Sequence, residues 1–151
     1  MKKKVSVAQA VNAYELLGSA KYQKMDDADK IKVWKITRLL RPLATRYSED
    51  KADAIGRLVS DSIRERLPKA QEYERISKEG TGELPMTEEE YKAFLTEYAG
   101  SVVLVKKALD EILCQEEELD AEFLTEESFG LLMASNDWSM RQVEALEFMV
   151  G

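Results

Sequence analysis

The sequence predicts an all-α fold, a helical bundle built on an antiparallel hairpin of two long helices. Between Tyr91 and Ile112, apolar residues recur at alternating steps of four and three, which is the heptad pattern of packed helices. A second long apolar stripe runs from Val33 to Tyr47 with similar steps. The 151 residues are 34% charged and 44% hydrophobic, a composition typical of one globular domain. We therefore expect a single helical domain over residues 1–151.

The elements of the basic half, residues 1–79, begin with a short helix over residues 7–22, which starts at a capping box formed by Ser6 and Gln9. An acidic turn at residues 26–29 then opens a helical stretch that extends to about residue 78. Pro42 and Pro68 interrupt its pattern, and we expect a break near residues 48–51 or at residue 68. Whether residues 27–78 form one helix or two stays open at this point.

A Gly/Pro linker at residues 80–86 separates this half from the acidic half, residues 87–151. Thr87 and Glu90 begin the heptad helix, and short C-terminal helices follow Thr125 and the capping box that starts at Ser139. Residues 119–124 are at most one short extended segment. The apolar positions that we expect in the core of the helix pair are Leu40, Leu43, Leu95, Val102 and Leu109.

The charge is divided unevenly between the two halves. Residues 1–79 hold 18 Lys and Arg against 12 acids, a net charge of +6, whereas residues 80–151 hold 4 against 17, a net charge of −13. Complementary charges beside an apolar seam select which helices pair. We therefore expect the acidic helix that follows residue 87 to lie antiparallel on the basic helix that follows residue 27, with the surplus acid left for a partner.

The residue types argue against an enzyme. The chain has no histidine, which removes the usual general base near neutral pH and the usual nitrogen ligand of zinc. The single cysteine, Cys114, lies beside acidic residues, which disfavour a reactive thiolate. The sequence predicts no catalytic residue, no cofactor and no metal site.

Binding to other proteins is the leading functional expectation, with a homodimer among the possible assemblies. The candidate contact residues are apolar groups near the C-terminus and a cluster of carboxylates: Trp138, Met140, Phe148, Met149, Glu117, Glu118 and Asp120. The same apolar groups could instead cover the end of the helical core. No apolar run is long enough to span a bilayer, and we expect no membrane partner.

Two alternatives come from the charges. The basic residues Arg38, Arg41 and Arg46 could bind nucleic acid weakly through one face of their helix, although the acidic half opposes it. Alternatively, the chain could be an acidic inhibitor that mimics DNA and occupies a host DNA-binding protein. That second option requires the carboxylates of residues 83–127 to share one exposed face.

Two sets of short segments resemble a small uncharacterised phage and prophage family that is encoded near tail and head genes. The segments are residues 13–17, 36–43 and 46–47 in the first half, and residues 109–113, 117–120, 138–139 and 146–149 in the second. Residues 48–104 depart from the family pattern. The resemblance implies an assembly-accessory protein of phage tails or capsids, located in the host cytoplasm or associated with the virion. It carries over no catalytic residue.

Overall fold

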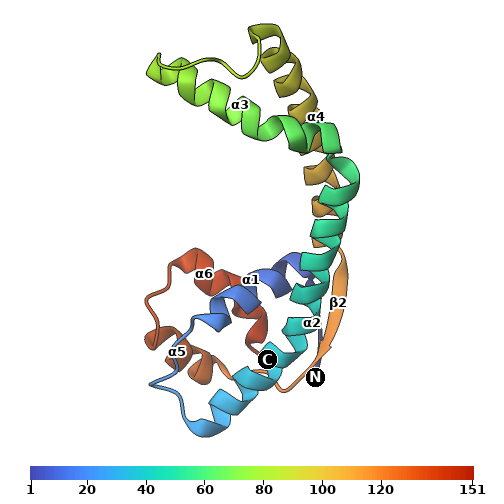
Figure 1. Cartoon of the computed structure of the whole chain (residues 1–151). Coiled ribbons are helices and arrows are strands. Elements are labelled where there is room, and N and C mark those ends of the chain that lie inside the picture. Colours follow the sequence, from blue (N-terminus) through green and yellow to red (C-terminus); the bar gives the residue numbers. More distant parts are fainter. The chain divides into compact units, whose positions relative to one another are not determined.

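The computed structural model describes all residues, 1–151, and confirms the prediction of a mostly helical bundle: 71% of the chain is helical. Six helices are joined by short connections, and one small sheet accompanies them (Figure 1). No helix is long and apolar enough to cross a membrane. In chain order the elements are β1 (Lys2–Ser6), α1 (Val7–Gly18), α2 (Asp27–Leu58), α3 (Asp61–Glu79), α4 (Glu88–Leu113), β2 (Glu116–Asp120), α5 (Glu126–Ala134), α6 (Met140–Ala145) and the 3-10 turn η1 (Glu147–Met149).

The chain forms two compact units. The first unit contains Met1–Glu49 and Glu111–Gly151, and the second contains Asp50–Asp110. The helices α2 and α4 each contribute residues to both units. The Gly/Pro stretch at residues 80–86 lies inside the second unit, where it connects α3 to α4.

The helix starts that the sequence predicts are confirmed by their hydrogen bonds. Ser6 and Ser139 each form a complete capping box, in which the hydroxyl accepts from the amide three residues later. Thr125 caps α5 in the same way, and the Thr87 hydroxyl accepts from the amide of Glu90. Each side chain satisfies an amide that would otherwise have no partner at a helix start.

The predicted helix boundaries are wrong in two places. The first helix ends at Gly18 rather than near residue 22. The long stretch is two helices, α2 and α3, and the break lies at residues 59–60 instead of 48–51 or 68. The Ser60 hydroxyl accepts from the amide of Ile63, so that a new helix starts there. Both Pro42 and Pro68 lie within helices that continue past them.

The small sheet pairs the basic N-terminal strand with an acidic strand. β1 and β2 are antiparallel, and the register places Lys2 opposite Asp120 and Lys4 opposite Glu118. The Lys2 ammonium lies 3.5 Å from a Glu118 carboxylate oxygen. In the first unit, carboxylates of β2 thus pair with cations of the basic half, and Glu117 does so with Arg46 of α2. In the second unit, Glu97 of the acidic helix α4 pairs with Arg66 of α3. The sheet also has one strand more than the single extended segment that we expected.

The core of the first unit joins elements from both ends of the chain. Val5 from β1, Ala13 from α1 and Leu40 from α2 are buried together with Leu132 from α5 and Met149 from η1. The C-terminal segment closes this core because the amide of Leu124 donates to the carbonyl of Met149 at 2.7 Å. The core of the second unit is smaller and packs α3 against α4 through Ile63, Ala70 and Phe94, together with Met86 from the segment that connects the two helices.

A buried hydrogen bond links α2 to α5 within the first unit. The Ser128 hydroxyl donates to the Asp29 carboxylate at 2.7 Å, and both residues are buried. Because Ser128→Ala removes this donor, we expect the free energy of unfolding to fall by about 1–3 kcal/mol. Urea titration followed by tryptophan fluorescence measures this loss, since both tryptophans, Trp34 and Trp138, belong to the first unit.

The matched control for this variant is Ser48→Ala, because Ser48 is exposed on α2. We expect that control to change the free energy by no more than about 0.5 kcal/mol. An equal effect of the two variants would show that the Asp29–Ser128 bond contributes nothing to stability.

Candidate binding surfaces

No group of three or more histidine, cysteine, aspartate or glutamate side chains is placed to hold a metal ion. Cys114 is a free, exposed thiol that follows the last residue of α4. Two surfaces expose large apolar side chains and are therefore candidates for binding: a segment of α4 and the outer face of α2.

The middle of α4 exposes apolar side chains where the heptad pattern predicts a packed seam. Leu95 is 43% exposed and Val102 is 47% exposed, and Tyr98 between them is also exposed. The expectation that Leu95 and Val102 lie in the core is therefore wrong for the single chain, whereas Leu40 is fully buried. Leu43 and Leu109 are half-buried.

A different side of α4 faces the core of the second unit. Phe94 is buried in that core, and Ser101, seven residues later on the same side of the helix, is also buried. Each of the two lies one residue before an exposed seam residue. Because successive residues in a helix are about 100° apart, the seam Leu95–Tyr98–Val102 lies beside the buried face rather than on it. Residues 98–105 form a run of eight without any charge, in which Val103 and Leu104 are exposed as well.

The outer face of α2 in the first unit exposes an aromatic residue among cations. Trp34 is 54% exposed and Ile31 is 51% exposed. The core side of this helix carries Ile36 and Leu40, which are fully buried. At 3.6 residues per turn, Ile31 and Trp34 lie on the side of α2 away from these residues, and so does Arg38, whose guanidinium lies 4.8 Å from the Trp34 ring centroid.

Residues 30–48 contain six cations and no acid. Three of the six have carboxylate partners: Lys30 with Asp27 at 3.8 Å, Lys32 with Asp29 and Glu122, and Arg46 with Glu117. The other three, Lys35, Arg38 and Arg41, form no ion pair. The positive charge of this face is therefore only partly neutralised within the chain.

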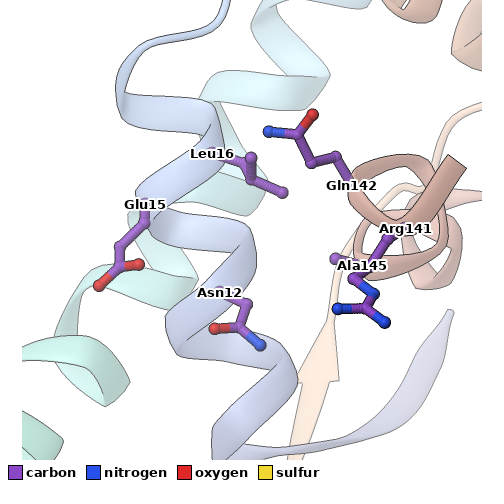
Figure 2. A pocket seen from close by; sticks show the side chains of 6 residues that line it. All are labelled: Asn12, Glu15, Leu16, Arg141, Gln142 and Ala145. Carbon is purple, nitrogen blue, oxygen red and sulfur yellow. The ribbon is translucent and has the colours of Figure 1, made fainter. Parts of the chain in front are cut away.

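Two shallow pockets lie on the first unit. One has a volume of about 330 Å³ and lies between α1 and α6, where Asn12 and Leu16 face Arg141 and Gln142 (Figure 2). Glu15 points away from its interior in Figure 2, and the Gln142 amide oxygen already accepts from the Ser139 amide. The other pocket has a volume of about 460 Å³ and adjoins the outer face of α2, and it is lined by Lys35, Arg38, Leu39, Asp120, Ala121 and Glu122.

The predicted contact residues near the C-terminus are mostly occupied within the fold. Phe148 and Met149 are buried in the first core, and Trp138 is half-buried against it. Only Met140 is highly exposed. The apolar groups at this end of the chain therefore cover the core, as the second interpretation of the sequence has it.

The predicted carboxylates and cations also engage one another. Glu117 pairs with Arg46, Glu118 with Lys2, and Asp120 with the N-terminal ammonium at 3.5 Å. Of the three arginines proposed to bind nucleic acid, only Arg46 forms an ion pair, whereas Arg38 and Arg41 do not. The exposure of Trp34 was missed from the sequence, although its position more than 100° around the helix from Ile36 and Leu40 was the available signal.

Comparison with models of known protein families, with curated proteins and with solved structures found no match.

Proposed function

We propose that this chain is a non-enzymatic assembly protein that associates with a second copy of itself through the exposed seam of α4. The observation that carries the proposal is the exposure of Leu95, Tyr98 and Val102 at heptad positions. Large apolar side chains that line up on one helix face are costly to leave in water, and covering them on association is favourable.

The helix itself favours another helix as the cover. Heptad spacing places the seam residues in one stripe that a partner helix can pack against by inserting its own side chains between them. Ala99, four residues after Leu95 and three before Val102, is small and leaves room beside the seam for a close approach. A second copy supplies an identical apolar stripe, as a twofold-symmetric interface requires.

Sedimentation velocity over the micromolar range tests this proposal. We expect the unaltered chain to sediment as a dimer of the 17.2 kDa chain. Val102→Glu should sediment as a monomer, because association would bury an unpaired carboxylate in the interface. Leu104→Glu is the matched control, since Leu104 is exposed on the same segment but lies off the seam, and this variant should remain a dimer. A monomer at every concentration of the unaltered chain would contradict self-association.

A role in phage or prophage assembly stays a proposal that rests on the resemblance of the short segments. Genes for tail or head proteins beside the gene of this chain would support it, and a location in the host cytoplasm or the virion follows from it. For the DNA-mimic alternative, the pairing of Glu117, Glu118 and Asp120 with cations of the first unit reduces the free acidic surface.

A further inference from the structure

We propose that the outer face of α2, formed by Ile31, Trp34, Arg38 and Arg41, binds an acidic amphipathic helix of another protein. In this complex an apolar side chain of the partner packs on Trp34, and its carboxylates pair with the two arginines. This surface belongs to the first unit, whereas the α4 seam belongs to the second, and the proposal does not depend on self-association.

The exposed tryptophan is the first argument for binding. A charged face alone is ordinary solvated surface, but Trp34 and Ile31 both stay about half exposed on the side of α2 that faces away from the core. Trp and Arg are the residues that most often contribute large binding energies when a partner covers them. Trp34 and Arg38 already contact each other, so that the aromatic ring and the cation are held together before binding.

The unpaired cations define the charge of the partner. Lys35, Arg38 and Arg41 recur every three residues and form no ion pair within the chain. Two of them can form bidentate bonds with carboxylates, because a guanidinium presents parallel N–H donors. An acidic partner is therefore complementary to this face, although the whole chain has a net charge of −7.

Two observations favour a protein over a nucleic acid as that partner. Ile31 adds apolar area one turn before Trp34, which amphipathic helices match and phosphate backbones do not. In addition, the carboxylates of Asp120 and Glu122 line the same pocket as Lys35 and Arg38. A partner helix can place an uncharged side chain opposite these carboxylates, whereas the phosphates of a nucleic acid strand recur at every nucleotide and would be repelled.

Fluorescence anisotropy with a labelled synthetic peptide tests the proposal. The probe is a helical peptide in which leucine recurs at steps of three and four and glutamate fills most other positions. The control probe has the same composition in a shuffled order that places no two leucines on one face. We expect saturable binding of the amphipathic probe, and binding of the shuffled probe that is at least about tenfold weaker.

Variants locate the binding to α2. We expect Trp34→Ala and the double variant Arg38→Glu/Arg41→Glu each to weaken binding by about tenfold or more. The double variant Lys51→Glu/Lys69→Glu changes the net charge equally in the second unit and should leave the affinity unchanged. Circular dichroism and the fluorescence of Trp138, which packs on the first core, show that each variant is folded.

A single-stranded oligonucleotide, labelled in the same way, tests whether this face prefers an acidic peptide or a nucleic acid. The proposal requires that it bind more weakly than the amphipathic peptide at the same salt concentration. The proposal is overturned if the peptide does not bind, if the two peptides bind equally, if the oligonucleotide binds more tightly, or if the Lys51/Lys69 control matches the loss seen with the α2 variants.

Discussion

Replacement of Leu40 by alanine is expected to lower the free energy of unfolding of the first unit by about 2–5 kcal/mol. Leu40 lies on α2 and is completely buried among residues of all parts of that unit. The variant removes apolar atoms from this core and leaves a cavity that the surrounding helices can fill only in part. Urea titration followed by tryptophan fluorescence measures the change, because Trp34 and Trp138 both report on this unit.

The neighbouring residue provides a matched control, since Leu39 has the same chemistry and is 39% exposed. We expect Leu39→Ala to cost less than about 1 kcal/mol, because little buried area is lost and no enclosed cavity forms. If the two alanine variants had equal effects, the assignment of the buried face of α2 would be wrong. The pair thus tests which side of α2 faces the core, on which the proposed binding surface also depends.

The sequence predicts the parts of this fold that depend on short-range interactions. The capping residues Ser6, Thr125 and Ser139 mark helix starts correctly because each side chain satisfies an amide only three residues away. The long helices are likewise visible from the spacing of their apolar residues. Such signals are complete within one or two helical turns, and no distant part of the chain is needed to interpret them.

The features that the sequence does not predict depend on distant partners. Lys2–Lys4 have no strand pattern of their own, and they become a strand because the acidic segment Glu116–Asp120 pairs with them from more than a hundred residues away. The break at Ser60 was also missed, because Pro42 and Pro68 are the stronger helix breakers in a sequence. The serine cap at residue 60 determines the actual boundary.

For the candidate binding surfaces too, the sequence shows the local pattern but not the distant contacts that decide which residues are buried. The heptad pattern of α4 predicts a seam, but it cannot say whether the same chain covers that seam. Phe94 and Ser101, one residue before the seam positions, take the buried side of the helix instead. A shift of one residue turns a helix by about 100°, and it is enough to move Leu95 and Val102 from the core to the surface.

Replacement of Lys3 by methionine is expected to detach the C-terminal segment from the first core. The Lys3 ammonium donates to the backbone carbonyls of Phe148, at 3.1 Å, and Val150, and it lies 4.9 Å from the centroid of the Phe123 ring. Methionine keeps the apolar stem but leaves both carbonyl groups without this donor. We expect a loss of about 1–3 kcal/mol in the free energy of unfolding.

The loss of stability in Lys3→Met should be largest in the C-terminal segment, which Lys3 contacts. The amide of Gly151 donates to the carbonyl of Leu124 at 2.9 Å, beside the bond from the Leu124 amide to Met149. Hydrogen exchange at these two amides should become faster in Lys3→Met, because local opening of the C-terminal segment costs less free energy. Lys4→Met is the matched control, since Lys4 is exposed on the same strand and forms no ion pair.

We expect the Lys4 variant to leave the exchange of both amides unchanged. Equal acceleration in the two variants would mean that the net charge of β1, rather than the contact between Lys3 and the two carbonyls, holds the C-terminus in place. Acceleration in Lys3→Met alone would show that the bonds from Lys3 to the carbonyls of Phe148 and Val150 add to the backbone bonds that hold the C-terminal segment on the first core.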